Sequence, residues 1–159
     1  MKAKIKQSIQ ENNLNYCVEC GKCTAVCPML GFYGEYEYDR SPRGVVERLS
    51  LAPEGIEDEE ALWYCLTCQE CTFFCPSGVN FQGFMTELRE LLLEHGCRKY
   101  AAFCHVCGGY LMPMRELQNF KKMVEGGKTG ELLSVCPQCK KENYVQTLYK
   151  LALWPKRKR

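Results

Sequence analysis

Two short runs of cysteine constrain this chain more than any other feature. Each run has the spacing C-x₂-C-x₂-C-x₃-C followed by proline, and the runs cover residues 17–28 and 65–76. Three thiols at equal spacing allow a tight loop to wrap one face of a cubane iron–sulfur cluster, and the fourth cysteine of such a run ligates the cluster of the other run. Two coincidental matches are implausible even in a chain with 13 cysteines among 159 residues. The sequence therefore predicts two [4Fe–4S] clusters.

The crossover of the fourth cysteine defines two sets of ligands. The first cluster is predicted to be bound by Cys17, Cys20, Cys23 and Cys75. The second cluster is predicted to be bound by Cys65, Cys68, Cys71 and Cys27. Zinc is a poor alternative, because structural zinc sites take their ligands in couples.

Cysteines in this number also raise the question of disulfide bonds. Disulfide frameworks are typical of secreted chains, but the basic residues 1–6 are followed by polar residues 7–13, where a signal peptide would be apolar. No apolar run approaches the roughly 18–20 residues that span a bilayer. We therefore expect a cytoplasmic, reducing environment, in which clustered cysteines bind metal, and no membrane span.

Two further C-x-x-C pairs predict a separate metal site. Its four thiols are Cys104, Cys107, Cys136 and Cys139, and they form a tetrahedral S₄ set that suits structural zinc. Mononuclear iron is one alternative, because Cys107-Gly108 and Cys136-Pro137 resemble rubredoxin; Lys140, in place of a glycine, argues against it. An empty or redox-active dithiol site is the other alternative. Cys97 is left over once the twelve ligands are assigned, and it is either a structural residue or a reserve ligand. His105 is expected to be an exposed loop residue.

The pattern of apolar residues indicates a mainly α fold in two parts. Residues 1–96 are predicted to form an α-helical ferredoxin dicluster domain, because the link 28–64 has room for two helices. Residues 97–159 are predicted to form a small α+β module of zinc-ribbon or treble-clef type, with a C-terminal helix and a basic tail at 156–159.

Capping and breaking residues predict where the helices lie. One helix covers 3–11, one starts at Ser41-Pro42, one is capped by Asp58, and one runs from Asn80 to Gly96. Helices are also expected over 114–124, ending at Gly126-Gly127, and over 141–153, ending at Pro155. Short strands are expected to flank Cys104 and Cys136.

Several residues around the cysteine runs are candidates for supporting roles. Gly21 is expected to adopt a conformation that lets backbone N–H groups reach cluster sulfurs, unless it is an ordinary turn glycine. Arg43 either supports a cluster or a partner contact, or is a solvated first-turn arginine. Aromatic residues are expected to exclude water from the clusters; they are Phe32, Tyr33, Tyr36, Tyr38, Trp63, Tyr64, Phe73 and Phe74.

Residues 10–96 resemble the C-type subunit of heterodisulfide reductase. The resemblance rests on Ser41-Pro42-Arg43-Gly44-Val45, on Leu62-Trp63-Tyr64-Cys65-Leu66-Thr67-Cys68-Gln69-Glu70-Cys71 and on Cys75-Pro76-Ser77-Gly78-Val79. Related modules occur in iron–sulfur subunits of succinate, glycerol-3-phosphate and glycolate dehydrogenases. The resemblance implies an electron wire within a hetero-oligomeric complex, whose partners are flavin or iron–sulfur oxidoreductase subunits. Such a complex can be one that is built around a flavin-dependent electron-bifurcating subunit.

Other functions receive less support from the sequence. The chain has no Cys-Cys-Gly segment, G-x-G-x-x-G, Walker A or nucleophile-elbow pattern, so no catalytic site of its own is expected. A free ferredoxin-like shuttle is an alternative, but 21 basic and 19 acidic residues do not give the acidic surface that steers such a protein. Nucleic-acid binding is disfavoured, because three filled sites at about −2 each outweigh the formal charge of +2.

Overall fold

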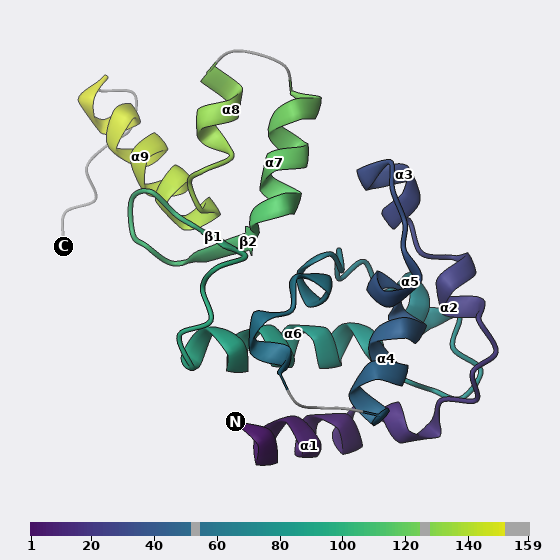
Figure 1. The fold of residues 1–159 in the computed structure, drawn as a ribbon. Coiled ribbons are helices and arrows are strands. Elements are labelled where there is room, and N and C mark those ends of the chain that lie inside the picture. Colours follow the sequence, from purple (N-terminus) through teal and green to yellow (C-terminus); the bar gives the residue numbers. More distant parts are fainter. Residues whose placement is uncertain (52–54, 125–127, 152–159) are drawn as a thin grey trace. The chain divides into compact units, whose positions relative to one another are not determined.

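The computed structural model describes residues 1–51, 55–124 and 128–151, and this part is mainly helical with a two-stranded sheet (Figure 1). The chain divides into two compact units, Met1–Tyr100 and Ala101–Arg159. The prediction of a mainly α fold followed by a small α+β module is confirmed. Within the described residues, no helix combines the length and apolar character that crossing a membrane requires.

The first unit consists of short helices joined by loops. Its α-helices are α1 (Lys2–Glu11), α2 (Lys22–Ala25), α3 (Met29–Tyr33), α4 (Pro42–Leu51), α5 (Glu70–Phe73) and α6 (Phe81–Glu94). Its 3₁₀ helices are η1 (Leu14–Tyr16), η2 (Tyr38–Arg40), η3 (Ile56–Asp58) and η4 (Glu60–Trp63).

The long helix α6 supplies the core of the first unit, and α1 packs against it (Figure 1). Its inward-facing side chains Phe84, Met85, Leu88 and Leu92 have exposed fractions of 0%. Burying a side chain of this size contributes about 1.5–3 kcal/mol. The C-terminus has a Schellman arrangement, in which the Cys97 N–H donates to Leu92 O at 2.9 Å and Gly96 has φ +84°. The helix predicted between Asn80 and Gly96 is confirmed.

A partly buried polar network ties α1 to the start of α6. The Asn80 side chain accepts a hydrogen bond from the Gly83 N–H at 3.1 Å and donates to Asn12 Oδ1 at 2.8 Å. Asn12 in turn donates to Glu87 Oε2 at 2.9 Å, and its backbone oxygen accepts from the Asn80 N–H at 3.0 Å. The network therefore fixes the segment after Cys75 against the segment before Cys17.

The helix start predicted at Ser41-Pro42 is confirmed in α4. Ser41 Oγ accepts a hydrogen bond from the Gly44 N–H at 2.9 Å, as an N-cap residue does. A Cβ atom on Gly44 would lie 2.0 Å from the backbone oxygen of Tyr38, so only glycine fits between α4 and η2.

The prediction that Asp58 caps a helix is wrong. The segment forms the two 3₁₀ helices η3 and η4, and the residue before η4 is Glu59, whose side chain makes no capping hydrogen bond. An α-helix does not develop because the chain must enter the second cysteine loop directly after Tyr64. Leu62 and Trp63 are nevertheless buried, each with an exposed fraction of 2%.

In the described part of the second unit, a hairpin is combined with three helices. Its elements are β1 (Ala101–Phe103), β2 (Tyr110–Pro113), α7 (Met114–Met123), α8 (Lys128–Leu132) and α9 (Pro137–Lys150). The strands are antiparallel, with Ala102 opposite Met112 and an irregularity before Phe103. The strand predicted before Cys104 is confirmed as β1.

The segment around Cys136 differs from its prediction. It contains no strand: Cys136 follows α8 and begins α9, where its Sγ accepts the Cys139 N–H at 3.4 Å and Pro137 occupies the first turn. The last helix therefore starts before residue 141. The predicted stops at Gly126-Gly127 and Pro155, and the basic tail at 156–159, lie outside the described residues.

Candidate metal centres

The two cysteine runs follow the same backbone path although their sequences differ. The residues on either side of the second cysteine are left-handed in both: Glu19 (φ 55°) and Gly21 (φ 76°) in the first run, Thr67 (φ 49°) and Gln69 (φ 72°) in the second. Gly21 is therefore left-handed, which fits both interpretations of this residue, the loop that directs N–H groups to sulfur and the ordinary turn glycine. A non-glycine residue held in this conformation costs about 1–3 kcal/mol. The shape of each loop therefore imposes a backbone conformation that these non-glycine residues do not prefer by themselves.

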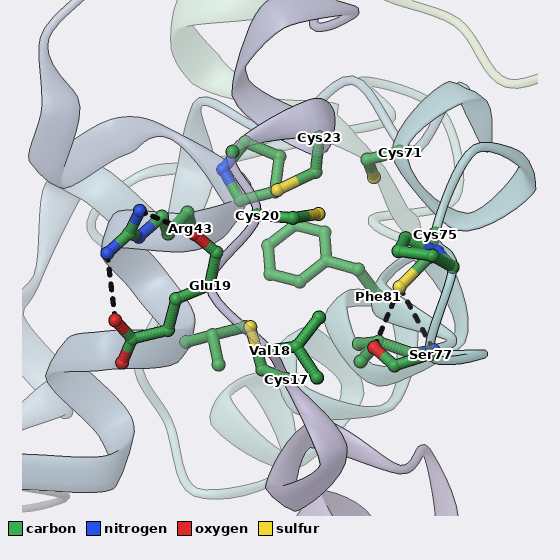
Figure 2. Close-up of a pocket in the computed structure, with 15 residues that line it drawn as sticks. Cys17, Val18, Glu19, Cys20, Cys23, Arg43, Cys71, Cys75, Ser77 and Phe81 are labelled. Atoms are coloured by element: carbon green, nitrogen blue, oxygen red, sulfur yellow. Dashed lines mark hydrogen bonds and ion pairs between the residues drawn. The ribbon is translucent and has the colours of Figure 1, made fainter.

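Four thiols from both runs line one pocket of the first unit. They are Cys17, Cys20, Cys23 and Cys75, the four predicted ligands of the first cluster, and Cys71 also reaches this pocket. Figure 2 shows them around a common space, together with the ring of Phe81. The sulfur of Cys75 accepts the Val79 N–H at 3.3 Å and lies 3.5 Å from Ser77 Oγ. Burial raises the pKa of Cys75, but these hydrogen bonds together lower it overall.

A second pocket gathers the other predicted set. It is lined by Cys27, Cys65, Cys68 and Cys71. The sulfur of Cys65 accepts the Thr67 N–H at 3.4 Å, so the left-handed loop residue directs its amide to the sulfur of a predicted ligand. Pro42, Cys71 and Phe81 line both pockets, which are therefore adjacent.

Cys71 and Cys27 of the second pocket are poorly suited to ionise without a bound cation. Burial raises the pKa of Cys71 to about 12, and the neighbouring Cys65 and Cys68 contribute to the rise. The pKa of Cys27 is also raised, mainly by burial, although hydrogen bonds from the Met29 N–H and the Tyr36 hydroxyl oppose the rise. Thiolate ligands are the form that binds metal. This donor set fits an iron–sulfur cluster, whose irons supply the missing positive charge.

Two arginines hold the two cysteine loops. Arg43 donates to the backbone oxygen of Glu19 at 2.8 Å and to its carboxylate at 3.0 Å (Figure 2). It therefore binds the first cysteine loop and is not a freely solvated side chain. Arg89 of α6 is buried and donates to the backbone oxygens of Leu62 and Cys65. Burial raises the pKa of Cys65, and the charge of Arg89 opposes that rise. Sequence reasoning missed Arg89, although a basic residue next to the apolar stripe of α6 was a possible signal.

The aromatic residues near the runs differ in exposure, and Phe32, Tyr33 and Tyr36 are half-buried. Trp63 and Tyr64, which precede the second loop, are buried, each with an exposed fraction of 2%. Phe73, Phe74 and Tyr38 are 81%, 47% and 50% exposed, so the prediction that they exclude water is wrong. The helix α5 is a single turn, and with Cys71 turned toward the pockets its next residues face solvent.

The second unit brings four thiols together around a point. The sulfurs of Cys104, Cys107, Cys136 and Cys139 all lie within 4.8 Å of one another. Cys107 Sγ and Cys136 Sγ are 3.7 Å apart. A tetrahedral site with metal–sulfur bonds of about 2.3 Å has sulfur–sulfur edges of about 3.8 Å. The arrangement therefore fits one tetrahedral ion.

Backbone N–H groups stabilise thiolate in this group. Cys104 and Cys107 lie in the loop between β1 and β2. Cys104 Sγ accepts the Cys136 N–H at 3.2 Å and the Val106 N–H at 3.4 Å. Hydrogen bonds from the backbone of Cys107 and Cys136 lower the pKa of Cys104 to about 6. The His105 side chain is exposed, as expected, while its N–H donates to the backbone oxygen of the buried Ser134 at 3.0 Å.

Comparison with known proteins supports this interpretation of the first unit. No curated protein and no solved structure shows a significant match to the chain. Residues 13–79, which contain both cysteine runs, match the family model described as the 4Fe–4S dicluster domain, and this match indicates an iron–sulfur, ferredoxin-like protein.

Proposed function

We propose that the chain is the electron-transfer subunit of a cytoplasmic, hetero-oligomeric oxidoreductase, similar to the C-type subunit of heterodisulfide reductase. The observation that supports this most strongly is that each pocket combines thiols of both runs: Cys17, Cys20, Cys23 and Cys75 line the first, which Cys71 also reaches, and Cys65, Cys68, Cys71 and Cys27 line the second. When bound, two [4Fe–4S] clusters supply sites for one-electron transfer. The first cluster is assigned to Cys17, Cys20, Cys23 and Cys75, and the second to Cys65, Cys68, Cys71 and Cys27.

The surroundings of the pockets suit a relay. Because Pro42, Cys71 and Phe81 line both pockets, two bound clusters would be neighbours within one rigid scaffold. Trp63 and Tyr64 are buried next to the second cysteine run, whereas Cys20 and Cys68 are exposed. An exposed ligand edge at each pocket gives an electron donor and an electron acceptor separate points of approach.

Isolation of the tagged protein without oxygen, followed by iron analysis and electron paramagnetic resonance, tests the cluster assignment. Dithionite-reduced protein is expected to show the signals of two interacting cubanes. A protein with no acid-labile sulfide contradicts the proposal.

Partner subunits require a separate test. Anaerobic affinity purification from native cells is expected to recover a flavoprotein or iron–sulfur oxidoreductase subunit in fixed ratio to this chain. Untagged cells processed in the same way are the control. A cluster-loaded protein that migrates alone indicates the alternative, a free ferredoxin-like shuttle.

For the second unit, we propose structural zinc bound by Cys104, Cys107, Cys136 and Cys139. The compact sulfur group and the N–H···S hydrogen bonds support a closed tetrahedral site. Zinc does not change oxidation state, so the unit would have a structural role. Native mass spectrometry distinguishes zinc from mononuclear iron, which would extend the relay instead.

A further inference from the structure

Arg89 has an environment that few arginines have. Its exposed fraction is 5%, and its guanidinium group donates to Leu62 O at 3.0 and 3.2 Å and to Cys65 O at 2.7 Å. The centroid of the buried Trp63 ring lies 5.7 Å away. Among the side chains that the structure describes, no carboxylate lies within ion-pair distance of Arg89. A buried charge without a paired charge is expensive unless an anion lies nearby.

The arginine at the first loop is arranged differently. Arg43 donates to a loop carbonyl in the same way, at 2.8 Å from Glu19 O, but the Glu19 carboxylate neutralises it at 3.0 Å. Its side chain is 29% exposed. At the second pocket, Arg40 is also paired, with Glu35 and Glu37. Arg89 is therefore the uncompensated positive charge among these three arginines.

We propose that Arg89 is a positioning residue that also raises the reduction potential of the second cluster. This inference rests on the proposed function, in particular on the assignment of Cys65, Cys68, Cys71 and Cys27. Reduction adds one negative charge to a cluster that already has a net negative charge, and potentials depend on net charge and nearby dipoles. A buried guanidinium on the carbonyl of a ligand residue favours the reduced state, and burial limits its screening by salt.

The two functions of Arg89, charge and hydrogen bonding, can be separated by substitution. Arg89→Gln keeps N–H donors for the carbonyl oxygens but removes the charge, whereas Arg89→Lys keeps the charge but loses the planar fork. If the charge of Arg89 sets the reduction potential of the second cluster, Arg89→Gln lowers that potential and Arg89→Lys preserves it. If only the loop geometry matters, both variants change it.

The experiment is a mediator-equilibrated redox titration of the cluster-loaded protein, followed by electron paramagnetic resonance. The signal of the second cluster is identified by its change in a Cys68→Ser variant. Arg89→Gln is expected to lower the ratio of reduced to oxidised second cluster at least tenfold at fixed potential, which is a shift of about 59 mV for one electron. In Arg89→Lys, this ratio is expected to stay within tenfold of its value in the unsubstituted protein. Arg43→Gln is the matched control and should leave the potential of the second cluster unchanged.

The outcomes separate this inference from the proposed function. Unsubstituted protein without two clusters overturns both. Two intact clusters with an unshifted second potential in Arg89→Gln overturn the role of Arg89 alone. If Arg89→Gln does not retain its second cluster, Arg89→Lys decides. A ratio of reduced to oxidised second cluster within tenfold of that of the unsubstituted protein supports the charge effect, and a larger change overturns it.

Discussion

Replacing Asn80 with alanine removes two interactions at the start of α6, directly after the segment that carries Cys75. The Gly83 N–H loses its capping acceptor, which lies 3.1 Å away, and Asn12 Oδ1 loses a donor at 2.8 Å. Loss of an N-cap costs about 1 kcal/mol. Loss of a hydrogen bond to a buried partner costs about 1 kcal/mol more, and Asn12 is 3% exposed. The sum of about 2 kcal/mol corresponds to a local opening about 30 times more frequent.

Amide hydrogen exchange of the cluster-loaded protein measures this opening, because exchange reports local unfolding equilibria. The amides of Gly83 and Val79 are expected to exchange about 30-fold faster in Asn80→Ala than in the unsubstituted protein. Asn80→Asp is the matched control, because it keeps the acceptor for Gly83 and loses only the donor to Asn12. Its Gly83 amide should remain protected. Equal protection in the alanine variant and the unsubstituted protein would refute both the cap and the link to α1.

Three further substitutions test other parts of the account. Cys27→Ser is expected to damage the second cluster and leave the signals of the first, measured by electron paramagnetic resonance; loss of the first cluster would overturn the crossover. Gly44→Ala places a Cβ atom 2.0 Å from Tyr38 O, so it should cost about 1–3 kcal/mol as an overpacking change. An unchanged melting temperature under anaerobic conditions would contradict that close approach. Cys139→Ser should remove zinc without lowering cubane iron, and a parallel loss of both metals would show that the sites are not independent.

The features predicted from sequence are those fixed by local spacing. The apolar period of residues 81–92 predicted α6, because a buried helix face requires that repeat. Ser41-Pro42 predicted the start of α4, because both residues act within one turn of their own position. The spacing of the cysteines likewise indicated which thiols would share a pocket.

The features that were missed depend on contacts between distant segments or on strain. Nothing local to Asn12 indicates that it binds Asn80, because their side chains meet only when α1 packs on α6. Thr67 and Gln69 are not residues from which a left-handed conformation is expected, and the shape of the loop imposes it on them. Arg89 lies next to the apolar stripe of a helix, where arginine is usually solvated.

The presence of two clusters is the central claim, and metal analysis tests it most directly. Protein purified without oxygen should contain about eight irons and about eight acid-labile sulfides per chain, together with about one zinc in the second unit. Four irons per chain would contradict the pair of clusters, and iron without sulfide would contradict cubane clusters altogether.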